Sequence, residues 1–114
     1  MKNNLFFSKN FAKEAKELSK KFRSLKESID KLSSELLENP YLGDAYGAKI
    51  YKVRIADKSK DGGKSGGFRV LYYHLTITEE GIDILLMSIF NKTDKATIKK
   101  EEALKLLNKI LGDI

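Results

Sequence analysis

The sequence predicts an α+β fold, in which the helices are segregated from a small antiparallel sheet. Apolar residues recur at helical spacing between residues 9 and 38, and again after residue 100. Between these segments the chain alternates with period two or forms β-branched and aromatic runs bounded by turn residues. The predicted order is β-α-α-β-β-β-α, with an N-terminal helical hairpin and a C-terminal helix. We expect the 114 residues to form a single domain, 1–114.

The first third of the chain predicts a short strand followed by two helices. The apolar stretch "NLFFS" (4–8) is the candidate strand, and its last residue, Ser8, is a plausible N-cap. The helical stripe then runs through 9–22 and, after a break, through 24–38. The second helix should end at Asn39, because a residue that precedes proline disfavours the helical conformation.

Three further strands and one helix are predicted after a glycine-bearing loop. The strands are "KIYKVRIA" (49–56), "GFRVLYYHLTI" (67–77) and "IDILLMSIF" (82–90), and "TEEG" (78–81) is a hairpin turn. Apolar residues from Ala103 to Leu111 give an amphipathic C-terminal helix.

The positive charge of the chain is concentrated in its middle. The net charge is +6, and the segment 49–69 holds seven Lys or Arg residues against two Asp residues. Such a local excess implies a polyanionic partner, with nucleic acid as the first candidate. From charge alone, a solvated surface that only aids solubility is an equally good explanation.

Several classes of protein are excluded by composition. The chain has no cysteine and one histidine, which leaves no disulfide scaffold and no transition-metal constellation, and no cofactor is expected. The N-terminus lacks a signal-peptide apolar run, and no segment approaches a membrane span, so we expect a cytoplasmic protein without membrane association. His74 should lie on the strand face opposite Arg69, as a packed histidine rather than a catalytic one.

The tripeptide Gly63-Lys64-Ser65 resembles the end of a nucleotide-binding P-loop, but its surroundings do not. Lys58 stands where that motif needs its first glycine, and a strand rather than a helix is predicted to follow. We therefore reject a nucleotide site. The glycines permit a tight connection and close approach of a ligand to the backbone.

Several cations are predicted to converge at the strands. Lys52 and Arg54 share one face of an alternating strand, and Arg69 opens the next strand, which a hairpin would place alongside. Lys92 ends the fourth strand, and Lys95 follows it. If the three strands are neighbours, these cations lie near one cleft.

The segments "IYKVRIADKSKDGGKSGGFRVLYY" and "LLMSIFNKTDKATI" resemble the RelE/ParE toxin superfamily of bacterial toxin–antitoxin modules. The likeness is greatest to RelE-like members called HigB, in which a "GKSGGFRV" stretch follows a "YKIR"-type strand. It covers nearly the whole chain. The resemblance implies a RelE-like fold and a ribosome-dependent mRNA endonuclease (mRNA interferase), which a cognate HigA- or RelB-like antitoxin inhibits.

The resemblance also implies roles for individual residues. Lys52 would transfer a proton, Arg54 would stand beside it on the basic strand, Arg69 would grip the scissile phosphate, and Lys92 would stabilise charge. These four are the candidate catalytic residues. The candidate substrate-binding residues are Lys58, Lys64, Lys95 and Tyr73.

The sequence departs from RelE at one position and leaves alternatives open. RelE carries a tyrosine just past the last strand cation, where counting places Ile98. Tyr46, Tyr51 and Tyr73 are available for base stacking, although tyrosines at such positions are more often core or surface residues. A ParE-like gyrase inhibitor without nuclease activity and a non-catalytic RNA- or ribosome-binding domain are the alternative functions.

Overall fold

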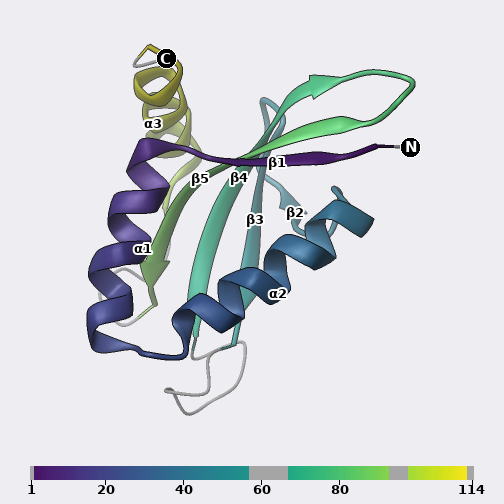
Figure 1. Cartoon of the computed structure of the whole chain (residues 1–114). Coiled ribbons are helices and arrows are strands. Elements are labelled where there is room, and N and C mark those ends of the chain that lie inside the picture. The colour runs from purple at the N-terminus through teal and green to yellow at the C-terminus, as the bar shows by residue number, and fades with distance from the viewer. Residues whose placement is uncertain (1, 57–66, 93–97, 113–114) are drawn as a thin grey trace.

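The computed structural model describes residues 2–56, 67–92 and 98–112, which form one mixed sheet and three helices (Figure 1). The candidate residues Lys58, Lys64 and Lys95, and the Gly63-Lys64-Ser65 tripeptide, lie outside the described residues. The elements in chain order are β1 (Asn4–Phe7), α1 (Lys9–Lys21), α2 (Leu25–Glu38), β2 (Asp44–Ala45), β3 (Ile50–Ile55), β4 (Phe68–Ile77), β5 (Ile82–Asn91) and α3 (Lys100–Gly112). The α+β class and the helical hairpin are confirmed.

The helical hairpin begins at the predicted cap. The Ser8 hydroxyl accepts a hydrogen bond from the Phe11 amide at 3.0 Å, which satisfies one of the free amides of the first turn of α1. The same hydroxyl donates to the Met87 carbonyl on β5 at 3.1 Å. The cap therefore both starts α1 and fastens it to the sheet.

The sheet has the strand order β1-β5-β4-β3-β2, and two details differ from the prediction. β1 pairs with β5 in parallel, so the sheet is mixed rather than antiparallel throughout. The period-two pattern that identifies a strand carries no information on its direction. The two-residue strand β2 was not predicted, because two residues are too few to show alternation.

Each face of the sheet carries its own apolar core. Side chains of α1 and α2 pack with one face, and side chains of α3 pack with the other (Figure 1). The first core contains Phe11, Leu25, Ile29, Leu32, Leu36, Ile55, Phe68, Val70, Tyr72, Ile82, Ile84, Leu86 and Ile89. The second contains Ile50, Leu71, Leu85, Met87, Ile98, Ala103, Leu107 and Ile110. The central strands β4 and β5 are buried on both faces along most of their length, which fixes their register.

The connection from α2 to β3 is held by buried polar groups. The Tyr72 hydroxyl donates to the Pro40 carbonyl at 3.0 Å and accepts from the Gly43 amide at 2.9 Å. His74 Nε2 lies 2.7 Å from the same carbonyl. Burial raises the pKa of Tyr72 to about 12, so this hydroxyl keeps its proton at physiological pH. The histidine is a packed residue, as predicted.

Within the described part of the chain, no helix is both long and apolar enough to cross a membrane.

Candidate functional site

The hairpin of β3 and β4 places three of the predicted cations on one face of the sheet. Arg54 lies directly opposite Arg69, and Lys52 lies opposite Leu71, two residues farther along the ladder. Residues opposite each other in an antiparallel pair project to the same side. Because Leu71 belongs to the second core, Lys52, Arg54 and Arg69 project toward the side of the sheet that carries α3.

Arg69 is the least exposed of these cations, with only 4% of its surface accessible. It lies between Arg54 on one neighbouring strand and Phe90 on the other. Burial first, and then the Arg54 charge, lower the pKa of Arg69. A guanidinium nevertheless stays charged at neutral pH. Like charges directly opposite each other in a sheet are destabilising, so this pair makes the end of the hairpin a strong attractor for anions.

The ends of three strands meet beside this arginine pair. A Cβ added to Gly67 would lie 2.0 Å from the Ile55 carbonyl oxygen, so only glycine allows β3 and the start of β4 to approach so closely. The Lys92 amide, just after β5, is 3.4 Å from the Gly67 carbonyl oxygen. This contact places Lys92, which is exposed, at the same end of the sheet as Arg54 and Arg69. We call Arg54, Arg69 and Lys92, together with Lys52 two residues before Arg54 on β3, the basic end of the sheet.

Lys52 has a neighbour that the sequence did not single out. Its ammonium lies 5.0 Å from the centre of the Tyr46 ring, and Tyr46 is half-buried against the second core. The sequence offered Tyr46 only as one of three tyrosines available for base stacking, and it gave no sign of a contact with Lys52. The only signal that could have marked it is its place beside Gly47, at the turn that opens the basic strand.

The remaining predicted site residues are placed as follows. Tyr73 is half-buried on the same face as Arg69, but four residues along β4, or about 13 Å away. Its ring packs with the second core. Tyr51 projects to the opposite face and stacks on Tyr72, with ring centres 5.3 Å apart. Ile98, at the position of the RelE tyrosine, is a core residue.

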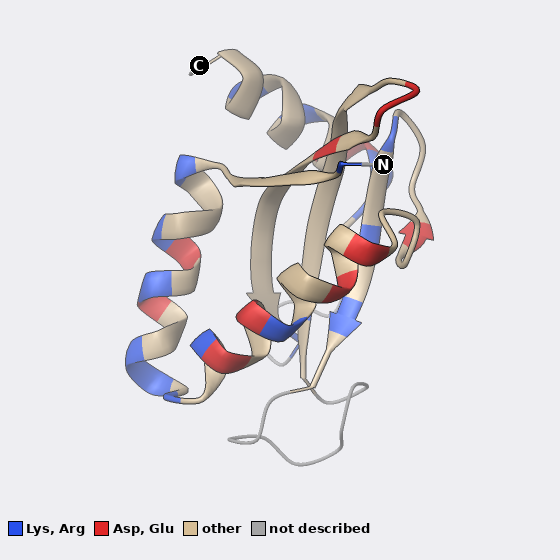
Figure 2. Cartoon of the chain, turned by 45° about the vertical axis from the view of Figure 1, so that its right-hand side comes forward, with Lys and Arg blue, Asp and Glu red and all other residues tan. Residues whose placement is uncertain are grey.

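Basic positions stand along β3, whereas α1 and α2 mix both signs of charge (Figure 2). Among residues 2–56, 67–92 and 98–112, no three His, Cys, Asp or Glu side chains come together in a way that could hold a metal ion. The described side chains of the basic end are those of lysine and arginine, which can bind phosphate oxygens, stabilise negative charge and move protons.

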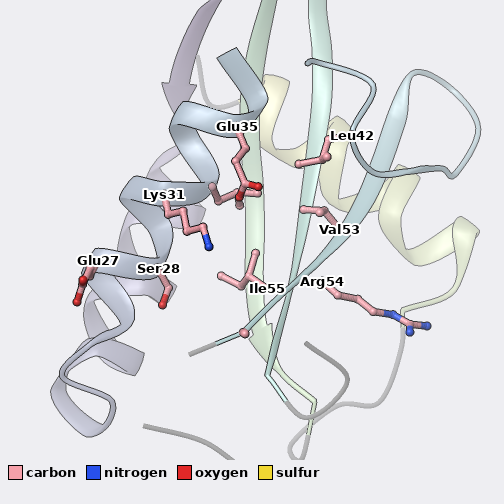
Figure 3. Close-up of a pocket in the computed structure, with 10 residues that line it drawn as sticks. Glu27, Ser28, Lys31, Glu35, Leu42, Val53, Arg54 and Ile55 are labelled. Atoms are coloured by element: carbon pink, nitrogen blue, oxygen red, sulfur yellow. The ribbon is translucent and has the colours of Figure 1, made fainter. Parts of the chain in front are cut away.

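A groove of about 450 Å³ between α2 and β3 lies apart from this chemistry. Leu42, Val53 and Ile55 line its floor, and Glu27, Lys31 and Glu35 of α2 line its rim (Figure 3). Arg54 borders the groove through its backbone, but its side chain points away from α2 (Figure 3). The groove belongs to the face that the helical hairpin covers, and the cations belong to the other face.

The chain is similar to known proteins in sequence and in fold. A family model described as the RelE toxin of the RelE/RelB toxin–antitoxin system matches residues 3–112. The fold is similar to that of a double arginine-to-alanine variant of the E. coli toxin RelE in the free state, with a TM-score of 0.57 and 21% sequence identity. That match covers 100% of this chain and 99% of the other. The chain therefore belongs to the RelE toxin family.

Proposed function

We propose that this protein is a ribosome-dependent mRNA endoribonuclease, the toxin of a type II toxin–antitoxin system that arrests translation. One observation carries the proposal: Arg54 and Arg69 oppose each other on neighbouring strands, and Arg69 is buried. Like charges directly opposite each other in a sheet repel. A phosphate diester that lies against the basic end would offset this repulsion.

Each cation has a part in the proposed reaction. Arg69 presents a planar fork of donors, held in place by burial, to the non-bridging oxygens of the scissile phosphate. Arg54 and Lys92 add charge from either side of it, where negative charge builds up in the transition state. Lys52, deeper along β3, takes the proton-transfer role.

The proposed reaction uses these side chains and the RNA itself. Lys52 accepts the proton of the 2′-hydroxyl, and the freed oxygen attacks the adjacent phosphorus. The bond to the 5′-oxygen breaks, and that oxygen takes the proton back from Lys52. The products are a 2′,3′-cyclic phosphate on one fragment and a 5′-hydroxyl on the other. Two lysines and two arginines supply the proton transfer and the charge stabilisation that these steps require.

The proposed partners follow from the same surface. mRNA held on the ribosome is the substrate, and a HigA- or RelB-like antitoxin encoded with the toxin is the inhibitor. Lys58, Lys64, Lys95 and Tyr73 remain proposed substrate contacts. An antitoxin that neutralises the basic end must bring acidic side chains or cover this face.

Controlled expression with mapping of mRNA 5′ ends tests the proposal. We expect new 5′ ends within translated codons when the native protein is expressed, and none with Arg69→Ala. Arg23→Ala is a matched control, because Arg23 is an exposed arginine outside the basic end. It should cleave like the native protein.

Two other results would replace the proposal. Intact mRNA together with gyrase-linked DNA breaks would identify a ParE-like gyrase inhibitor. A protein that sediments with ribosomes but leaves mRNA and DNA intact would identify a non-catalytic ribosome-binding domain.

A further inference from the structure

We infer that Tyr46 is a positioning residue for Lys52, and that it links the proposed proton-transfer group to the start of α3. The expected effect on mRNA cleavage rests on the proposed function. The contact between Tyr46 and Lys52 can be measured without any enzymatic activity. Tyr46 lies in the loop before β3, so it shares no element with Lys52 or with α3.

The first observation is the set of groups around the Tyr46 ring. The Lys52 ammonium lies 5.0 Å from the ring centre, and the Lys100 ammonium, from the first turn of α3, lies 5.9 Å from it. Both distances fall within the range in which a cation is attracted to the face of an aromatic ring. The Tyr46 hydroxyl donates a hydrogen bond to the Ile98 carbonyl oxygen, just before α3. The Tyr46 side chain thus contacts Lys52 on β3, Ile98 just before α3 and Lys100 in the first turn of α3.

The second observation is the backbone that holds Tyr46 in place. Gly47, Ala48 and Lys49 have φ values of 84°, 53° and 65°, so three successive residues are left-handed. Left-handed backbone is costly for Ala and Lys, and it persists only where the surroundings impose it. Those surroundings are hydrogen bonds that close the turn and fasten it to β4: Tyr46 N to Ile50 O at 2.7 Å, Ile50 N to Gly47 O at 2.9 Å, and His74 N to Lys49 O at 3.0 Å.

The consequence for Lys52 is a restricted position. A lysine carries its charge on four flexible carbons, and a proton-transfer group must stay within hydrogen-bond reach of its target. A strained turn fixes the Tyr46 backbone, and the bond to Ile98 fixes the far end of the ring. The ring face then limits where the Lys52 ammonium can lie. Small displacements of a reacting group cost large factors in rate, so this restraint serves catalysis.

Proton NMR of the Lys52 side chain tests the contact directly. A proton over an aromatic face resonates upfield of its usual position, so the Lys52 methylene protons nearest the ammonium should be shifted upfield in the native protein. Tyr46→Phe keeps the ring and should keep the shift. Tyr46→Leu removes the ring and should return these protons to the usual lysine frequency, whereas the methyl signals of Leu71 and Met87 should stay dispersed if the core remains folded.

Single-turnover cleavage of mRNA on programmed ribosomes tests the role. Tyr46→Leu should lower the cleavage rate about 3- to 30-fold, the range expected for a lost cation–π contact, with ribosome affinity unchanged. Tyr46→Phe should recover most of the loss. In a Lys52→Met background, Tyr46→Leu should cause no further loss, because a positioning residue has nothing left to position.

Three outcomes overturn the inference. The first is an unshifted Lys52 signal in the native protein. The second is an equal loss of rate from Tyr46→Leu with and without Lys52, which would make Tyr46 a structural residue only. The third is a Tyr46→Phe variant as impaired as Tyr46→Leu. If the native protein does not cleave mRNA at all, the proposed function fails, and the NMR comparison alone decides whether Tyr46 positions Lys52.

Discussion

At the scale of single residues, Arg54 and Arg69 place two like charges directly opposite each other on neighbouring strands. Burial removes water from Arg69, and Arg54 adds a like charge, so both influences lower its pKa. An apolar pair at these positions would pack without that repulsion. An anion bound beside the pair would relieve this repulsion, as the proposed function requires.

Replacing Arg54 by glutamine should therefore separate stability from activity. Arg54 is exposed, so the variant loses little packing and is relieved of repulsion. We expect the free energy of unfolding in urea to rise by about 0.5 kcal/mol at low salt, and less at high salt, where surface charges are screened. mRNA cleavage should fall. Arg23→Gln, at an exposed position outside the basic end, should change neither quantity. A clear loss of stability in Arg54→Gln would show that the pair holds the fold together.

Glu14 makes the stability of the folded protein depend on pH, independently of the basic end. Its carboxylate accepts hydrogen bonds from Asn10 and Ser88, each at 2.8 Å, but burial outweighs them and raises its pKa above 4.5. The folded protein thus binds a proton more tightly than the unfolded chain does. Stability from this group is complete below pH 4.5 and is lost as the pH rises through the folded-state pKa.

Glu14→Gln should remove this dependence. We expect the stability difference between the variant and the native protein to grow in favour of the variant as the pH rises from 4 to 7. Urea unfolding at several pH values measures it, and Glu79→Gln, in the exposed hairpin turn, is the control. A difference that stays constant with pH would mean that the fold does not raise the pKa of Glu14.

At the scale of elements, the basic end depends on how closely two strands approach. Gly67 packs against the Ile55 carbonyl, and two residues later Arg69 lies directly opposite Arg54. The glycine-rich stretch that resembles a P-loop therefore ends in a residue whose purpose is strand packing. A strand, β4, follows it, as the sequence predicted.

Gly67→Ala should disturb stability and the site together. The added Cβ would lie 2.0 Å from a backbone oxygen, which cannot move without parting β3 from β4. We expect a loss of about 1–3 kcal/mol in the free energy of unfolding, the usual cost of overpacking, together with a loss of cleavage. Gly112→Ala, where the new Cβ meets no atom within 4 Å, should be neutral or slightly stabilising. Native stability in Gly67→Ala would contradict the close approach.

The elements themselves were largely predictable, and their arrangement less so. Helical spacing located α1 and α2 to within a residue or two, and the alternation of β3 correctly set Lys52 and Arg54 apart from Tyr51 and Val53. The parallel direction of β1 and the existence of β2 depend on tertiary contacts that leave no local pattern. The burial of Arg69 and the contact of Tyr46 with Lys52 were unpredictable for the same reason: each depends on a neighbour distant in sequence.

At the scale of the whole molecule, the two faces of the sheet have different roles. The helical hairpin seals one face over the larger apolar core and leaves a groove beside β3. The other face carries α3 (Figure 1). The smaller core, Lys52, Arg54 and Arg69 lie on that face as well. The well-packed central strands β4 and β5 anchor the sheet that carries these cations, and the proposed charge stabilisation of a transition state requires such fixed positions.

The most direct measurement of the central claim is the single-turnover rate of mRNA cleavage on programmed ribosomes for Arg69→Ala, made together with its ribosome affinity. If the basic end is the catalytic site, the rate should fall by about 10²-fold or more, because a preorganised donor to the transition state is lost. Affinity should change only a few-fold, since the other cations remain. A variant that binds ribosomes and cleaves at the native rate would contradict the account.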